Sequence, residues 1–228
     1  MRKQISTILL VSASCGTVAT AQTNLNFNTS NVFSFDHAFH SPGAIAFPQR
    51  LQGAVGTQWL FAGLAGDDLR SSLGNLIYPL GDNSAVGLRA AYFASRLFQQ
   101  GAYSVLFGQK FFDDRLGIGI NANLLSYAYD RNNFTPDFDL DDPVLARGAS
   151  KSAFSFGLGF FFQPSWRFAL GASVDHLNRP DIAIGNTDFK KHPVFKMGVL
   201  FNSTAFSPQF DLQLENREVA LQGSVRKS

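Results

Sequence analysis

The sequence predicts an all-β fold, a transmembrane antiparallel up-and-down β-barrel of about ten strands. Three observations predict it: the chain begins with an export signal, its apolar residues then alternate with small or polar ones, and its connections alternate between short and long. The 24 Phe and 20 Gly residues also suit a pleated surface that is apolar on one side and uncrowded on the other.

Residues 1–21 have the features of a secretory signal peptide. Arg2 and Lys3 precede an apolar stretch over residues 5–18, and the small residues at 19–21 form a cleavage site. The apolar stretch is too short to span a bilayer. We therefore exclude this segment from the fold.

The remaining chain is divided into two parts. We expect residues 22–50 to form an N-terminal periplasmic or plug segment, and residues 51–228 to form the barrel of the outer membrane. Cleavage also removes Cys15, which excludes cysteine catalysis, disulfides and thiolate metal sites. Without Arg2 and Lys3, 17 Lys and Arg residues balance 17 Asp and Glu residues.

Two further classes are excluded by the pattern of charge and hydropathy. The sequence has no basic stripe interleaved with aromatic residues, so we expect no nucleic-acid partner. After the signal it has no apolar stretch of about 18 residues, so we expect no transmembrane helix. An exported chain of this kind is either a periplasmic protein or a barrel.

Period-two alternation distinguishes these two classes. It is clearest in residues 152–163, whose apolar face carries Phe154, Phe156, Leu158, Phe160 and Phe162. Comparable segments of about ten residues, the length of a tilted membrane-spanning strand, are 51–61, 84–94, 103–111, 115–124, 166–176, 193–201, 210–214 and 219–225. We expect the apolar faces to contact outer-membrane lipid. The residues expected to face the lumen are Arg89, Asn121, Asn123, Arg167 and Asp175.

Connection lengths argue against a soluble β-sandwich, which would also alternate. We number the connections between the predicted strands in chain order. The shortest connections are residues 113–114 and 164–165, and both have even numbers. The longest connections are residues 130–150 and 177–191, and both have odd numbers. Short periplasmic turns and long exterior loops are typical of outer-membrane barrels, whereas the loops of a sandwich have no reason to sort in this way.

Three short stretches are similar to a known family. Residues 40–46 follow the signal, residues 141–144 lie in the long central loop, and residues 171–181 have the pattern Gly-x-Ser-x-x-His-Leu-x-x-Pro. Over about residues 40–200 the chain thus resembles the PorP/SprF family, outer-membrane components of the type IX secretion and gliding machinery of Bacteroidota. Members of that family usually have more strands, and the sequence lacks the terminal aromatic residue typical of barrel-assembly signals. The strands counted here therefore form either a small barrel or an incomplete larger one.

The resemblance implies a non-enzymatic component that binds or anchors secreted surface proteins and contacts other secretion-machinery proteins. A porin-like or fatty-acid-type transport barrel is the second hypothesis, and an outer-membrane lipid hydrolase is the third. A hydrolase needs a Ser–His pair on neighbouring strands. Ser173 and Asp175 point away from the face expected for His176, so we interpret His176 as an interfacial or loop-anchoring residue.

Partner binding is expected in the two long loops and in residues 33–48, because loops on a rigid scaffold vary freely and carry function. The candidate partner-binding residues are Phe134, Asp137, Phe138, Asp139, Asp141, Asp142, Asn178, Arg179, Pro180 and Asp181. The aspartates do not form a calcium loop, since Asp142 and Gly148 occupy the positions that require Gly and Glu. We expect no catalytic residue, metal or cofactor, and interpret His37 and His40 as structural.

Overall fold

The computed structural model describes residues 41–60, 69–129, 150–184, 189–201, 206–215 and 218–227. One short 3-10 helix, η2 (Ala44–Ala46), precedes a series of strands. The strands are β1 (Gln52–Leu60), β2 (Leu69–Pro79), β3 (Ser84–Ala94), β4 (Phe98–Phe111), β5 (Leu116–Tyr129), β6 (Ser150–Ser165), β7 (Phe168–Asp175), β8 (Val194–Phe201), β9 (Phe206–Glu215) and β10 (Glu218–Lys227). The predicted all-β class is confirmed. Within the described ranges, no helix has the length and hydropathy needed to cross a membrane.

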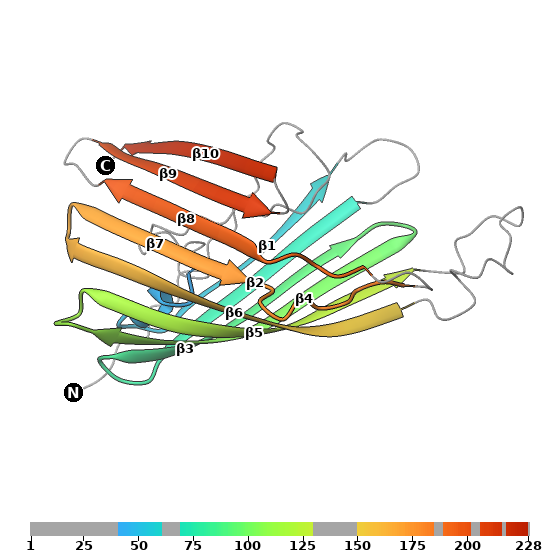
Figure 1. The fold of residues 1–228 in the computed structure, drawn as a ribbon, viewed down its shortest axis with the longest axis horizontal. Helices are drawn as coiled ribbons and strands as arrows, with labels where there is room; N and C mark the ends of the chain where they lie inside the picture. The colour runs from blue at the N-terminus through green and yellow to red at the C-terminus, as the bar shows by residue number, and fades with distance from the viewer. Residues whose placement is uncertain are drawn as a thin grey trace, which may run out of the picture.

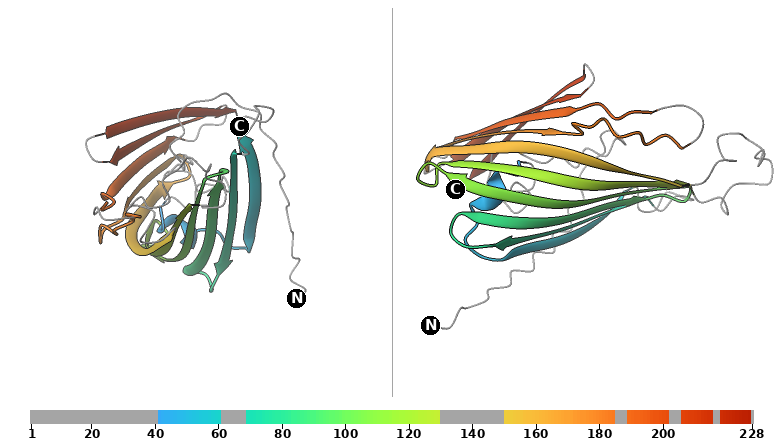
Figure 2. Two further views of the ribbon diagram at one scale, coloured as in Figure 1. Left: turned by 90° about the vertical axis from the view of Figure 1, so that its right-hand side faces the viewer. Right: turned by 60° about the horizontal axis from the view of Figure 1, so that its bottom comes forward.

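Each strand pairs in antiparallel orientation with the next strand along the chain, from β1 to β10 (Figure 1). The predicted up-and-down order is therefore confirmed. Figure 2 shows that the sheet curls on itself. In the part of the chain that the structure describes, β1 and β10 form the two edges and do not pair with each other, so the sheet is an open trough.

Strand register sorts the side chains into an exposed apolar convex face and a concave face of small, polar or fully buried apolar residues. One outward row runs across seven strands through Val86, Phe107, Ile120, Leu158, Val174, Phe195 and Leu214. The neighbouring inward row runs through Ala85, Gly108, Gly119, Gly159, Ser173 and Lys196. Because successive side chains of a strand point to opposite faces, this register keeps the two kinds of residue apart.

The outward residues are solvent-exposed although they are large and apolar. Phe154 is 65% exposed, Ile120 is 60% exposed and Phe195 is 53% exposed. The inward side chains Ile77, Leu106, Phe161 and Leu200 are fully buried. A water-soluble sheet would bury its apolar face, whereas an apolar exterior is what a strand needs beside lipid.

One predicted connection lies two residues from its expected position. The sequence predicts a turn at residues 164–165, but β6 continues to Ser165 and the turn falls at residues 166–167. The register of β6 against β7 shifts between Phe162 and Ser165, because β6 carries one extra residue there. Such a bulge lengthens one strand relative to its partner, and the alternating pattern alone does not reveal it.

This shift changes the position of Arg167. The prediction that Arg167 faces the lumen is wrong, because the residue lies in the exposed turn and not within β7. Its guanidinium carbon lies 5.1 Å from the centre of the Trp166 ring, a cation–π contact at the end of the trough.

A second connection is shorter than predicted. The sequence predicts a connection over residues 95–101, but β4 already begins at Phe98. The Ser95 hydroxyl accepts a hydrogen bond of 3.0 Å from the Phe98 amide, and the Ser95 amide donates one of 2.8 Å to the Phe98 carbonyl. These bonds close a tight turn, so Phe98 enters the strand.

We predict that a charged residue on the convex face lowers stability strongly only where it lies within the strands, away from the turns. Ile120→Arg should lower the stability of the protein folded in lipid vesicles by about 2–4 kcal/mol, the cost of a lipid-facing cation near the bilayer centre. Phe112→Arg is the matched control, because Phe112 is also exposed and apolar, at 77%, but lies in the turn after β4. It should cost less than about 1 kcal/mol. Denaturant titration in vesicles measures both, and equal costs would contradict a lipid-facing surface.

Candidate functional site

The concave face holds three layers, which can be followed along the inward residues of β5. Gly117 and Gly119 lie near the 112–115 turn, Asn121 and Asn123 lie midway, and the Leu125 and Tyr127 side chains are buried near the opposite end. The first and third layers each receive a segment of the chain that lies outside the strands, whereas the second is formed by strand residues. The interior is therefore the candidate functional site.

The first layer is the seat of residues 41–47. Ser41, Ala44, Ile45 and Ala46 are all at most 3% exposed, although they belong to no strand. The Ser41 hydroxyl donates a hydrogen bond of 2.8 Å to the Phe160 carbonyl of β6. The Ala44 amide donates to the Ser41 carbonyl, which turns the chain into η2. This segment is bound into the trough.

Glycines of the neighbouring strands β4 and β5 make room for this segment. A Cβ atom on Gly119 would collide with the Pro42 carbonyl, and one on Gly117 would collide with the Gly43 carbonyl. A Cβ atom on Gly108 would lie 2.7 Å from the Pro42 carbonyl oxygen. Since glycine permits close backbone approach, the register of β4 with β5, which pairs Gly108 with Gly119, creates the seat.

Apolar contacts hold the same segment on both sides of η2. Ile45 forms a buried cluster with Ile77, Ala85 and Leu106 of β2, β3 and β4. Ala44 and Phe47 pack against a second buried cluster formed by Phe161, Ala169 and Leu200 of β6, β7 and β8. The Phe47 and Phe161 rings meet edge to face at 5.0 Å. Residues 41–47 thus bridge strands from β2 to β8.

The second layer is polar. Lys196 Nζ lies 2.9 Å from Asp175 Oδ2, and Asn121 Nδ2 donates a 2.9 Å hydrogen bond to Asp175 Oδ1. Both charged side chains are less than a fifth exposed, so each needs the other to offset the cost of burial. The described residues offer no partner to the buried Asn75 amide or the Ser173 hydroxyl, and a wet interior would supply one.

The third layer is the segment after β7, which turns inward at His176. His176 has a left-handed backbone, with φ of 59°. The imidazole therefore reaches the concave side, where Nδ1 lies 2.6 Å from the Ser155 hydroxyl of β6. Burial, together with the charge of Lys191, lowers the pKa of His176 to about 4, so the imidazole is neutral at physiological pH. The expectation that His176 faces away from Ser173 and Asp175 is wrong, since it ignored this backbone conformation.

Further contacts tie this segment to the end of the sheet opposite the 112–115 turn. Asn178 Nδ2 donates a hydrogen bond of 2.8 Å to the Phe154 carbonyl, and Asn178 Oδ1 accepts one of 3.2 Å from the Phe156 amide. Asn178 thus completes the edge of β6 beyond the end of β7. Ile182 is 8% exposed and packs against Leu125 and Tyr127 on the concave side. The segment therefore covers part of this end of the trough.

Asp181 organises the segment on its outer side. Its Oδ1 accepts hydrogen bonds from the Ala183 and Phe189 amides, at 3.0 and 3.1 Å. These amide donors lower the pKa of Asp181 below its usual value. Its Oδ2 lies 3.3 Å from Lys151 Nζ of β6. An ionised Asp181 therefore joins both arms of the segment to β6.

The candidate partner-binding residues fall into two groups. Asn178, Arg179, Pro180 and Asp181 lie together in this segment; Pro180 is buried, whereas Arg179 is exposed. Phe134, Asp137, Phe138, Asp139, Asp141 and Asp142 lie outside the described residues. Partner binding by either group stays a prediction. In the described ranges no group of three His, Cys, Asp or Glu side chains could hold a metal ion.

Sequence reasoning missed the seat, the Lys196–Asp175 pair and the Ser155–His176 contact. Glycines at alternate positions of neighbouring strands were a usable signal for the seat, because Gly108, Gly117, Gly119 and Gly159 all occupy inward positions. The other two contacts depend on strand pairing and on a left-handed residue, which leave no local pattern.

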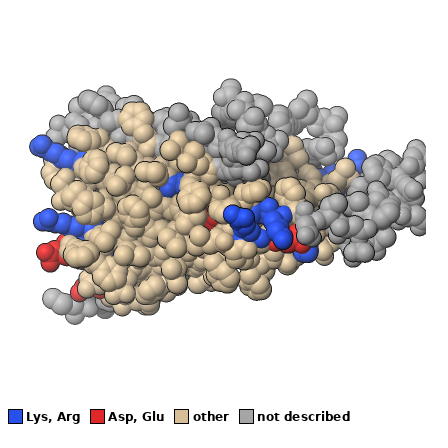
Figure 3. All heavy atoms as spheres, viewed as in Figure 1, with Lys and Arg blue, Asp and Glu red and all other residues tan. Residues whose placement is uncertain are grey.

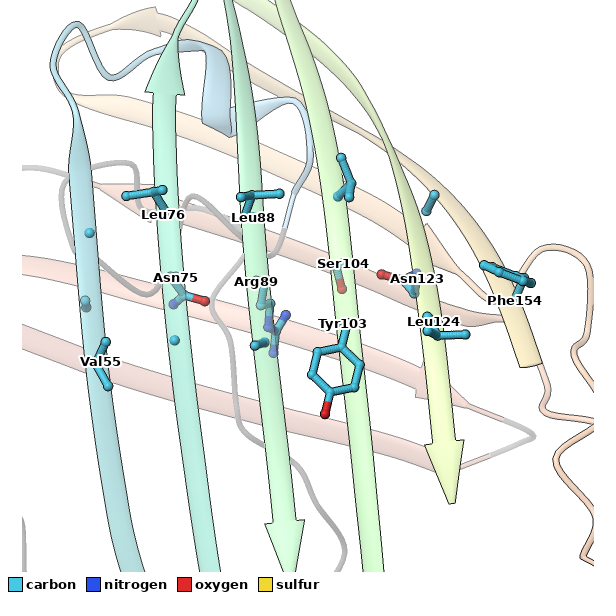
Figure 4. Close-up of a pocket in the computed structure, with 16 residues that line it drawn as sticks. Val55, Asn75, Leu76, Leu88, Arg89, Tyr103, Ser104, Asn123, Leu124 and Phe154 are labelled. Carbon is cyan, nitrogen blue, oxygen red and sulfur yellow. The ribbon is translucent and has the colours of Figure 1, made fainter. Parts of the chain in front are cut away.

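The convex face carries a separate hollow of about 750 Å³ across β1 to β6. In Figure 4 the side chains of Val55, Leu76 and Tyr103 lie on the opposite side of their strands from Asn75 and Arg89. The small residues Gly74 and Ala90, which pair in register, form part of its floor. Its lining is almost entirely apolar, so it suits acyl chains.

We predict that the glycine seat is required for stability. Gly119→Val should destabilise the protein by about 1–3 kcal/mol, the usual cost of overpacking, because the new side chain meets the Pro42 backbone. Gly74→Val is the control, since a Cβ on that strand glycine meets nothing within 4 Å. A cysteine at position 41 should react with maleimide only in the Gly119→Val background. Equal stability of the two variants would contradict the seat.

A comparison with protein families gives one match. The model of the family described as "Type IX secretion system membrane protein PorP/SprF" matches residues 67–222, more than half of the chain. No curated protein and no solved structure matched the chain. The family match agrees with the resemblance seen in residues 171–181. The chain therefore belongs to the PorP/SprF family of type IX secretion system membrane proteins.

Proposed function

We propose that this chain is a non-enzymatic β-barrel of the bacterial outer membrane, which holds secreted surface proteins or other parts of the type IX secretion and gliding machinery. The observation that carries the proposal is the pair of opposite faces. The convex face is apolar from β1 to β9, and the concave face is filled by segments of the same chain. Such a molecule suits a scaffold in lipid.

Closure of the barrel follows from the cost of free strand edges in lipid. The edge strands β1 and β10 have about ten residues each, and every unpaired backbone group in the hydrocarbon layer costs several kcal/mol. We therefore infer that β1 pairs with β10, or that further strands fill the gap. Either arrangement converts the trough into a closed wall.

The connections support an orientation. The turns after β4 and β6 are short, whereas residues 130–149 and 176–193 form long connections on the opposite side. We assign the short turns to the periplasm and the long connections to the exterior. Residues 41–47 then lie at the periplasmic end, where they serve as a plug, and the exterior loops are available to partners.

The lipid-hydrolase hypothesis has one feature in its favour, the 2.6 Å contact between Ser155 and His176. A nucleophile must be reached by its substrate, and Ser155 has no exposed surface. Asp175, the carboxylate next in sequence, is engaged by Lys196 and Asn121. The contact is better explained as an anchor for the exterior segment.

We predict that the wild-type protein does not behave as an open porin. Residues 41–47 fill the interior at one end, and Ile182 packs into it at the other. In planar bilayers we expect no steady ionic current from the purified protein at voltages where a general porin, inserted as the positive control, conducts. A steady ohmic current from the wild type would favour the transport hypothesis instead.

The proposed scaffold function is tested by changing the exterior loop without changing the barrel. We expect deletion of residues 134–142 to reduce secretion or surface attachment of type IX cargo at least several-fold, with normal barrel abundance. Replacing Asp137, Asp139, Asp141 and Asp142 by Asn keeps the loop length and tests charge alone. Deletion of residues 33–40 probes the periplasmic side. Normal secretion in all three strains, at normal barrel abundance, would remove the proposal.

A further inference from the structure

A group of basic side chains lies at the outer end of β6. It consists of Lys151 at the start of β6 and of Arg179, Lys190 and Lys191 in the segment between β7 and β8, and we call it the basic cluster. Figure 3 shows Lys and Arg side chains gathered on the viewer's face of the molecule, beside acidic atoms and next to a broad uncharged surface. Arg179 and Lys190 are both exposed.

The fold of the segment brings these residues together from different parts of the chain. Asp181 and Lys190 form an isolated antiparallel β-bridge. The Lys191 amide donates a hydrogen bond of 3.0 Å to the Pro180 carbonyl. Lys151 reaches the same point from β6 through its 3.3 Å contact with Asp181. Within the described residues, Asp181 forms an ion pair with Lys151 of the cluster. The exposed Arg179 and Lys190 present positive charge at this surface.

Apolar side chains lie directly beside the cluster. Leu177 is 45% exposed, Phe189 is 63% exposed and Phe154 is 65% exposed. Leu177 continues the apolar convex face, since its amide bonds to the Phe156 carbonyl of β6 at 3.0 Å. Along residues 177–179 the chain thus passes from an apolar residue through Asn178 to a cation. Such a gradient is typical of the boundary between acyl chains and headgroups.

We propose that the basic cluster binds the phosphorylated headgroup of a lipid in the leaflet around this end of the barrel. This proposal rests on the proposed function, which places the protein in the outer membrane. Arg179 can grip a phosphate in bidentate geometry, and Lys190 supplies a point charge. The exposed Phe154, Leu177 and Phe189 would contact the acyl chains of the same lipid. An acidic protein partner would satisfy the cations but would leave these apolar contacts unexplained.

The experiment uses the purified full-length protein in neutral detergent, with native mass spectrometry as the readout. The probe is bis-phosphorylated lipid A, and phosphatidylcholine is the zwitterionic comparison. The double variant Arg179→Gln/Lys190→Gln should bind lipid A about thirty-fold more weakly, from roughly five-fold per basic residue near an anionic headgroup. The control Arg115→Gln/Arg167→Gln removes two exposed cations from the opposite end and should bind as the wild type does.

Three outcomes would overturn the proposal: equal loss in the control, unchanged binding in the double variant, or complete displacement of lipid A by equimolar inorganic phosphate. Loss of a copurifying acidic protein with lipid A binding intact would assign the cluster to a protein partner. Failure of the proposed function is read separately, by cell fractionation and by labelling a cysteine at position 133 with impermeant maleimide. If the protein binds lipid A but does not reach the outer membrane, the proposed scaffold function is wrong and the proposed headgroup site stands.

Discussion

Strand register is the constraint on which both faces of this protein depend. The pairing of Phe107 with Ile120, and of Ile120 with Leu158, places large apolar side chains side by side on the convex face. The same register aligns Gly108, Gly119 and Gly159 on the concave face, where residues 41–47 approach their backbone. A slip of one residue in β5 would expose polar groups to lipid and fill the seat with side chains. Exterior and interior therefore cannot vary independently.

The concave face of the trough is filled near both of its ends. Apolar clusters around Ile45 and Ile182 occupy its two ends, and a polar layer with the Asp175–Lys196 pair lies between them. Each filled layer adds contacts across strands that are not neighbours, which supports the wall from inside. A rigid wall of this kind fits the proposed function, in which loops at fixed positions hold other proteins.

The segment after β7 shows how a long loop is attached to such a wall. Left-handed residues at His176 and Arg179 reverse the chain. Asn178 makes the backbone hydrogen bonds to β6 that a longer β7 would have made, and Ser155 and Asp181 hold the segment through further hydrogen bonds. This arrangement presents Lys190 and Arg179 outward while Ile182 packs inward. One short segment therefore serves both the interior and the surface.

The sequence alone determined the all-β class and most of the alternating faces, because period two is a local property of a strand. It also predicted that His176 is an interfacial or loop-anchoring residue, and in the structure His176 contacts Ser155. The tertiary structure decided what depends on residues far apart in the chain. The bulge after Phe162 moved Arg167 out of the interior, and the left-handed φ of His176 brought its ring to β6. The glycine seat and the Asp175–Lys196 pair arise from register between strands, which an alternating pattern does not encode.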